Sequence, residues 1–191
     1  GDLGWTSNSI TDYDSDGCRD NEIEDPDDDN DSVLDSSDSC PKGDLGWISN
    51  TTTDYDTDGC QDNSSEDTDD DNDGMNDSVD DCPVGDLNWI SNSSTDYDSD
   101  GCQDSIEDND DDNDSALDSS DDCQKGDLGW TSSSITDYDS DGCQDSNEDT
   151  DDDNDSVSDS SDDCQKGDLG WTSSSITDHD SDGCQDSNED T

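Results

Sequence analysis

Basic and large apolar side chains are what this sequence has least of. Four Lys and Arg stand against 63 Asp and Glu in 191 residues, Phe is absent, and 20% of the residues are apolar. A formal net charge of −59 leaves no basic patch for phosphates, so we expect no nucleic-acid binding. No long apolar run is present, so we expect no membrane insertion. So little apolar surface cannot offset the entropy lost on ordering, and a conventional hydrophobic core is excluded.

Groups for catalysis are also scarce. The single histidine, His179, takes a place that tyrosine holds in the other repeats, and no nucleophile stands beside a base in a repeated pattern. The composition is too poor in apolar residues to line a substrate pocket. We therefore predict that the chain is not an enzyme.

A repeat organises the chain. The motif GDLGW or GDLNW starts at five glycines, which are 42, 42, 41 and 41 residues apart: Gly1, Gly43, Gly85, Gly126 and Gly167. The predicted units are residues 1–42, 43–84, 85–125 and 126–166, followed by a partial fifth unit at 167–191. Because the last unit stops within its acidic part, we expect the array to continue beyond this chain.

Each unit contains a Gly/Leu/Trp/Ser/Thr segment and two acidic blocks. No window has the 3.6-residue apolar period of an amphipathic helix, and the only strand-like stretches are short Ser/Thr-rich runs such as residues 130–136. We predict an irregular repeat array of loops, turns and isolated helical turns, with little regular secondary structure.

The second acidic block carries five carboxylates at positions 1, 3, 5, 9 and 12 of a loop. This is the oxygen spacing of a calcium loop, in which alternate side chains turn inward. The predicted ligands are Asp27, Asp29, Asp31, Asp35 and Asp38; Asp69, Asp71, Asp73, Asp77 and Asp80; Asp110, Asp112, Asp114, Asp118 and Asp121; and Asp151, Asp153, Asp155, Asp159 and Asp162. Position 6 is Gly at Gly74 but Ser at Ser32, Ser115 and Ser156, so we expect those three loops to be looser or differently wound.

The first acidic block repeats the spacing and has Gly at position 6 in every repeat. Its predicted ligands at positions 1, 3, 5 and 9 are Asp12, Asp14, Asp16 and Asp20; Asp54, Asp56, Asp58 and Asp62; Asp96, Asp98, Asp100 and Asp104; Asp137, Asp139, Asp141 and Asp145; and Asp178, Asp180, Asp182 and Asp186. Position 12 is Glu107, Glu148 or Glu189 in repeats 3 to 5 and is predicted to add a ligand. An extra residue moves Glu24 and Glu66 to position 13 in repeats 1 and 2, where coordination must adjust.

Oxygen ligands without His or thiolate favour Ca²⁺ over zinc or copper. Two carboxylates about 5 Å apart repel by roughly 3 kcal/mol at an effective dielectric of about 20, so a cation must offset the repulsion around each loop. We predict about nine Ca²⁺ sites, one per loop, with calcium ions as the principal partner and as part of the fold. Nine Ca²⁺ would bring the formal charge from −59 to −41.

The stretch DDDNDSVLDSSDSCP, from Asp27 to Pro41, resembles thrombospondin type 3 repeats. Their pattern, D-x-D-x-D-G-x-x-D-x-x-D-x-C-P, is matched at its Cys by Cys40, Cys82, Cys123 and Cys164, and at its Pro by Pro41 and Pro83. The resemblance implies an almost structureless chain wrapped around calcium ions and held by disulfides in an extracellular protein. The GDLGW segment and the first-block cysteines have no counterpart in that pattern.

The nine cysteines predict a disulfide framework in an oxidising compartment, outside the cell or at its surface. Their spacing alternates near 20 and 22 residues and allows two chain-order pairings. We favour pairs within a repeat, which would tie two loops together: Cys18–Cys40, Cys60–Cys82, Cys102–Cys123 and Cys143–Cys164, with Cys184 unpaired in this chain. The alternative pairs cross the repeat boundary, begin with Cys40–Cys60 and leave Cys18 over.

The tryptophan of each GDLGW segment is expected to form a small cluster with the nearby leucine, or a seam between units; a sugar-binding platform is the alternative. These residues are Trp5, Trp47, Trp89, Trp130 and Trp171 with Leu3, Leu45, Leu87, Leu128 and Leu169. Tyr13, Tyr55, Tyr97 and Tyr138 are at loop position 2 and should point away from the ion.

Among the Asn-x-Ser/Thr sequons, Asn50 and Asn92 are the candidate glycosylation sites, because they lie outside the loops.

These observations predict a calcium-rigidified spacer, stalk or fibre segment of a secreted or cell-surface protein, with self-association into fibres as a further hypothesis. The alternative is an acidic calcium reservoir or a mineral- or ligand-binding module, in which the exposed carboxylates are themselves the function.

Overall fold

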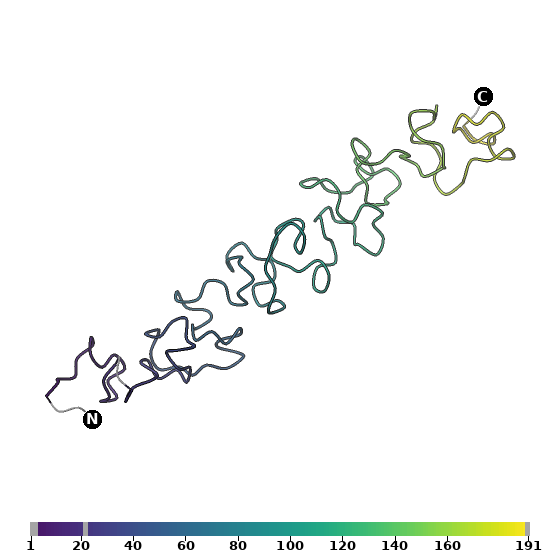
Figure 1. The fold of residues 1–191 in the computed structure, drawn as a ribbon. Coiled ribbons are helices and arrows are strands. Elements are labelled where there is room, and N and C mark those ends of the chain that lie inside the picture. The colour runs from purple at the N-terminus through teal and green to yellow at the C-terminus, as the bar shows by residue number, and fades with distance from the viewer. Residues whose placement is uncertain (1–3, 21–22, 190–191) are drawn as a thin grey trace. The chain divides into compact units, whose positions relative to one another are not determined.

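The computed structural model of the chain describes residues 4–20 and 23–189. Throughout these residues the backbone forms turns, bends and irregular segments, without a helix or a strand (Figure 1). This confirms the prediction of little regular secondary structure. In the same residues no helix is long and apolar enough to cross a membrane.

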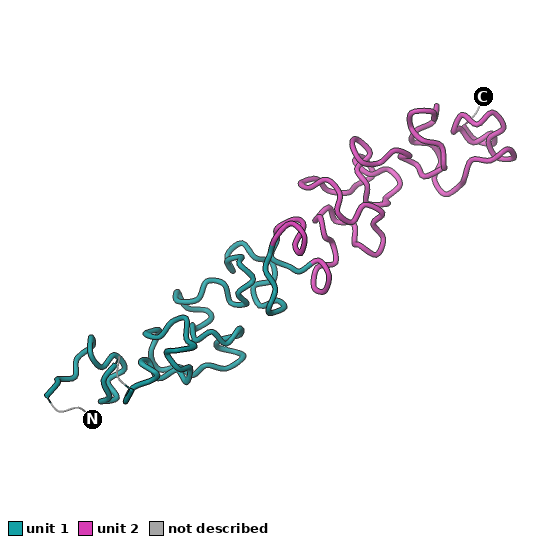
Figure 2. Tube along the Cα trace, in the orientation of Figure 1, with its two compact units in different colours: residues 1–91, 100–103 teal, residues 92–99, 104–191 magenta. Residues whose placement is uncertain are grey.

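The chain divides into two compact units (Figure 2). One contains Gly1–Ser91 and Asp100–Gln103, and the other contains Asn92–Ser99 and Asp104–Thr191. The division falls inside the third predicted repeat, so the units differ from the sequence repeats. The contacts described below each lie within one unit.

Every acidic loop turns through left-handed backbone at its fourth and sixth positions. Position 4 has φ between 53° and 66° in all nine loops: Ser15, Asn30, Thr57, Asn72, Ser99, Asn113, Ser140, Asn154 and Ser181. Position 6 has φ between 79° and 98°: Gly17, Ser32, Gly59, Gly74, Gly101, Ser115, Gly142, Ser156 and Gly183. The three serines therefore adopt the same conformation as the glycines, although left-handed backbone disfavours a side chain. The expectation that the serine loops are differently wound is wrong.

The Asp-x-Asp spacing itself shapes these loops. The carboxylate of Asp56 accepts the backbone N–H of Asp58, 3.2 Å away, and the carboxylate of Asp58 accepts that of Cys60 at 2.9 Å. Asp side chains favour such bonds to backbone two residues further on, and the bonds compete with regular secondary structure. The same sequence feature that supplies carboxylates thus winds the chain around them.

The interior of the molecule consists of carboxylates and sulfur. The buried apolar residues in the described part of the chain are four disulfide-bonded cysteines, whereas many aspartates are less than 10% exposed. The leucines of the GDLGW segments are exposed by 38–52% at Leu45, Leu87, Leu128 and Leu169. The tryptophans are only half-buried. The tryptophans and leucines therefore form no buried core at these four segments, and Leu3 lies outside the described residues.

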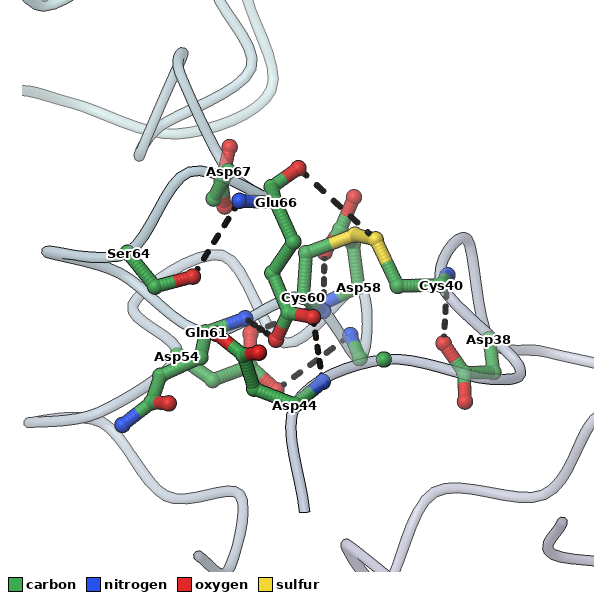
Figure 3. Close-up of a disulfide and its surroundings, with 12 residues drawn as sticks. Asp38, Cys40, Asp44, Asp54, Asp58, Cys60, Gln61, Ser64, Glu66 and Asp67 are labelled. Carbon is green, nitrogen blue, oxygen red and sulfur yellow. Dashed lines mark hydrogen bonds between the residues drawn. A yellow bond between two sulfur atoms is a disulfide. The ribbon is translucent and has the colours of Figure 1, made fainter. Parts of the chain in front are cut away.

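The disulfides cross the repeat boundary. They join Cys40–Cys60, Cys82–Cys102, Cys123–Cys143 and Cys164–Cys184 (Figure 3 shows the first). This corrects the favoured pairs Cys18–Cys40, Cys60–Cys82, Cys102–Cys123 and Cys143–Cys164, and confirms the alternative pairing. Cys184 is bonded, and Cys18 is the free cysteine.

A backbone hydrogen bond explains this pairing. The N–H of Ser39 donates to the carbonyl of Asp58 at 2.7 Å, and the Cα atoms of Cys40 and Cys60 are 5.1 Å apart, within the range of a disulfide. Equivalent bonds join Asp81 to Asp100, Asp122 to Asp141 and Asp163 to Asp182, at 2.7–2.8 Å. The end of each second loop is thereby held against the first loop of the next repeat.

Candidate metal-binding loops

The second-block loop of repeat 1 brings three of its five carboxylates close together. Oxygen atoms of Asp27, Asp29 and Asp31 lie within 4.8 Å of one another. The position-5 aspartates are fully buried, at 0% exposure in each of the four loops: Asp31, Asp73, Asp114 and Asp155. Position 12 is also buried, at 6–9% exposure: Asp38, Asp80, Asp121 and Asp162. The alternating aspartates of the sequence therefore have carboxylate oxygens that lie close together in the structure.

Many of these buried oxygens have no protein partner. One oxygen of Asp155 accepts the N–H of Val157 at 2.7 Å, whereas its other oxygen, Oδ2, is buried without a hydrogen bond. The Oδ2 atoms of Asp31 and Asp114 are in the same situation. So are the Oδ2 atoms at position 12 of Asp38, Asp121 and Asp162. A buried carboxylate oxygen without a donor carries a large desolvation cost, which a metal ion would offset.

The electrostatics of position 12 is consistent with such a centre. Burial raises the pKa of Asp38 to about 7, against the opposing N–H of Cys40, and the charges of Asp29, Asp31 and Asp35 raise it further. Burial and the charges of aspartates in the same loop raise the pKa of Asp80 and of Asp121 to about 7. Carboxylates that resist ionisation at neutral pH are those that a divalent cation would stabilise most.

The first-block loops also gather carboxylates, although these lie nearer the solvent. Oxygens of Asp12, Asp14 and Asp16 lie within 4.8 Å of one another, as do those of Asp54, Asp56 and Asp58. Position 1 is buried to 0–1% exposure in all five loops: Asp12, Asp54, Asp96, Asp137 and Asp178. In the fifth repeat Asp180 and Asp186 are exposed.

Asparagine at position 4 of each second loop joins the two loops of a repeat. The amide of Asn154 donates to the carboxylate of Asp139 and, at 2.9 Å, to that of Asp141 in the first loop. Asn30, Asn72 and Asn113 make the equivalent bond to Asp14, Asp56 and Asp98. The sequence indicated no structural role for these asparagines, which combine the left-handed turn with a link between loops.

The glutamates after the first loops accept backbone N–H groups. Glu148 accepts from Gln144 at 3.0 Å and from Asp127 at 2.8 Å. Glu189 makes the same pair of bonds, to Gln185 at 3.0 Å and Asp168 at 2.5 Å. Glu107 is at the corresponding place in repeat 3. The structure thus gives Glu148 and Glu189 a clamping role that the ligand prediction did not include.

The extra residue of repeat 2 leaves this clamp intact. Glu66 accepts the N–H of Gln61 at 2.8 Å and that of Asp44 at 2.5 Å, so its carboxylate joins the end of the first loop to the GDLGW segment (Figure 3). Glu66 therefore serves as Glu148 and Glu189 do, despite its shifted position.

The GDLGW segment and the residues just after it form hydrogen bonds with the second loop of the preceding repeat. The N–H of Gly43 donates to the carboxylate of Asp29 at 2.7 Å, and the N–H of Ser49 donates to the carbonyl of Asp31 at 2.8 Å. Gly85, Gly126 and Gly167 bind Asp71, Asp112 and Asp153 in the same way, each at 2.7 Å. The sequence did not predict these contacts. The donors are backbone N–H groups, which every residue except proline has, and the acceptors belong to the loop of another repeat.

Tyrosine at loop position 2 links successive repeats. The hydroxyl of Tyr13 donates to the carbonyl of Gly43 at 2.9 Å, and Tyr55, Tyr97 and Tyr138 bind the carbonyls of Gly85, Gly126 and Gly167 at 2.8–2.9 Å. Of the candidate glycosylation sites, the side-chain amide of Asn50 donates to the carbonyl of Ile48 at 2.9 Å, whereas the side-chain oxygen of Asn92 accepts the N–H of Ser94.

A second kind of acidic cluster, which the loop spacing does not predict, lies between the two loops of a repeat. Oxygens of Asp20, Asp25 and Asp28 lie within 4.8 Å of one another, and so do those of Asp62, Asp67 and Asp70. Lys42 forms an ion pair with Asp20 and another with Asp28 at 3.2 Å. Burial opposes the ionisation of Asp20, but Lys42 and the N–H of Tyr13 outweigh it and lower the pKa of Asp20. The few lysines of this chain therefore neutralise specific carboxylates.

Comparison with known proteins adds no family to these observations. No protein-family model matches the sequence, and a search of the curated proteins gave no match.

Proposed function

We propose that the chain is a calcium-rigidified structural segment, serving as a spacer, stalk or fibre element of a secreted or cell-surface protein. The observation that carries the proposal is the fully buried position-5 aspartate of each second loop, whose Oδ2 has no donor at Asp31, Asp114 and Asp155. Calcium is the cation that fits best, because the surrounding ligands are all oxygens at the spacing of a calcium loop. The resemblance to thrombospondin type 3 repeats supports the same assignment.

The links between repeats favour a structural role. The Cys40–Cys60 disulfide, the Ser39–Asp58 backbone bond and the Tyr13–Gly43 hydrogen bond each join neighbouring repeats. An arrangement in which each repeat is fastened to the next transmits stiffness along the chain, as in other repeat proteins. The disulfides favour an oxidising compartment outside the cell.

Calcium titration with small-angle scattering of the full chain tests this function. We expect the chain to be expanded in chelator and to gain a fixed, calcium-dependent set of interatomic distances as the loops fill. Many weak sites that fill without a change in the scattering curve would contradict the spacer and favour the calcium reservoir.

A matched pair of variants links the change to the loops. Asp155→Asn removes charge from a fully buried position-5 carboxylate, whereas Asp163→Asn changes an exposed aspartate eight residues later. We expect the first to lose calcium at one loop and the second to behave as the wild type. Equal effects from both would show that net charge, and not loop geometry, governs calcium binding.

A further inference from the structure

The acidic cluster of repeat 2 differs from its counterparts in one residue. The last residue of repeats 1, 3 and 4 is a lysine, directly before the first glycine of the next repeat. Its ammonium group pairs with two carboxylates of its own repeat. Lys42 binds Asp20 and Asp28, Lys125 binds Asp104 and Asp111, and Lys166 binds Asp145 and Asp152. Repeat 2 has Val84 at this position, and its side chain is 53% exposed.

The carboxylates themselves are retained in repeat 2. Asp62, Asp67 and Asp70 are 5%, 8% and 8% exposed, and their oxygens lie within 4.8 Å of one another. Oδ2 of Asp67 and Oδ1 of Asp70 are buried without a hydrogen-bond partner. In repeat 1 the equivalent oxygens, Oδ2 of Asp25 and Oδ1 of Asp28, are also buried without a hydrogen-bond partner, and Lys42 supplies a positive charge by pairing with Oδ2 of Asp28 at 3.2 Å. The cluster of repeat 2 thus keeps the carboxylates that bind a lysine in the other repeats, but no Lys or Arg among the described residues forms an ion pair with it.

We infer that Asp62, Asp67 and Asp70 form an additional divalent-cation site, for Ca²⁺, in which the ion takes the place that a lysine ammonium occupies in repeats 1, 3 and 4. Asp67 and Asp70 are not among the inward ligand positions of either loop, whereas Asp62 is position 9 of the first loop, so the additional site has two ligands of its own and borders that loop. The inference rests on the proposed function only in taking calcium as the cation present.

The dimensions and chemistry of the cluster fit calcium. Calcium binds oxygen at about 2.3–2.6 Å, so two oxygens on one ion are at most about 5.2 Å apart, and the three carboxylates meet this limit. All three ligands are hard oxygens, and no histidine or thiolate belongs to the cluster. Both oxygens of Asp62 accept the same N–H, that of Tyr55, at 3.1 and 3.2 Å, so one of them can turn to an ion while the other keeps this bond.

Exchanging lysine and valine between repeats tests the inference in both directions. Calcium bound per chain is measured by equilibrium dialysis with elemental analysis and by native mass spectrometry of the full, oxidised chain. We expect Val84→Lys to bind one Ca²⁺ fewer than the wild type, because the ammonium group displaces the ion. Lys125→Val and Lys166→Val should each bind one more. Val84→Leu is the uncharged control and should keep the wild-type number.

The outcomes separate this site from the proposed function. A wild-type chain that binds no calcium contradicts the proposed function. A wild-type chain with filled loops, together with unchanged numbers in Val84→Lys and in both lysine-to-valine variants, overturns the additional site alone. Bound sodium in place of calcium at this cluster, detected by the same elemental analysis, would also overturn it.

Discussion

Replacing Gly59 by alanine tests whether the second loop of one repeat is closed by the first loop of the next. Gly59 has a φ of 93°, and a Cβ built there would collide with the Asp38 carboxylate, whose Cγ would be 2.6 Å away. The Asp38 Cα would be 3.2 Å away, so the carboxylate must rotate away and the Asp38 backbone must also shift by a few tenths of an ångström. Gly17 has the same loop position and a φ of 94°, with nothing within 4 Å of its built Cβ. Gly17→Ala is therefore the matched control.

Both variants place a side chain on left-handed backbone, and only Gly59→Ala also displaces the Asp38 carboxylate. Left-handed backbone with a side chain costs about 1–2 kcal/mol in both. At Gly59 the position-12 carboxylate of Asp38 must also move, which we expect to weaken calcium binding in that loop by about tenfold, or about 1.4 kcal/mol. Gly59→Ala should therefore be less stable than Gly17→Ala by about that amount when calcium is present.

Isothermal titration of calcium, together with urea unfolding in saturating calcium, measures both effects on the full chain. The expected result is one weakened site in Gly59→Ala and unchanged site affinities in Gly17→Ala. If the two variants lose equal stability and keep equal calcium affinity, the proposed contact between Asp38 and the next repeat has no role in binding, and the reasoning is refuted.

Three further predictions concern pH, the tyrosine link and the serine turns. Burial raises the pKa of Asp38 and Asp121 to about 7, above an unfolded value of about 4. Their contribution to the stability of the compact, calcium-free chain is therefore present below about pH 4 and is lost as the pH rises through about 7. The hydrodynamic radius in chelator should therefore grow over that range, and a chain that instead contracts would contradict the burial of these groups. Tyr138→Phe removes the 2.8 Å bond to the Gly167 carbonyl and should cost about 1 kcal/mol in thermal unfolding, whereas no loss at all would show that the link is not formed. Ser115→Gly should stabilise the loop by up to about 1 kcal/mol in urea unfolding, because φ is 81° there, and Gly74→Ser should have the opposite sign; a destabilising Ser115→Gly would count against left-handed strain.

The local features of the fold were predictable because the sequence repeats them. Alternating aspartates such as Asp27, Asp29 and Asp31 fix both the carboxylates and the Asx-type bonds that wind the loop, so the gathering of these side chains followed from spacing alone. The absence of helices and strands from residues 4–20 and 23–189 followed from the lack of any apolar period. Calcium binding itself stays a prediction until metal content is measured.

Features that depend on contacts outside the repeated loop pattern were not predictable from that pattern. The disulfide pairing is set by the backbone bond from Ser39 to Asp58, and backbone groups carry no sequence signature. Glu148 was predicted as a ligand because its position matched, yet its carboxylate accepts two N–H groups from separate segments. Asp67 and Asp70 fall outside the alternating ligand pattern, so only the fold shows that they lie beside Asp62.

The calcium content of the native chain tests the central claim most directly. The chain is isolated with its disulfides intact, dialysed against calcium at physiological concentration and analysed for bound metal per molecule. Since each loop is expected to hold one ion, the account predicts at least about nine Ca²⁺ per chain. A content below about five would contradict it, because most of the buried carboxylates would then be without the charge that the fold requires.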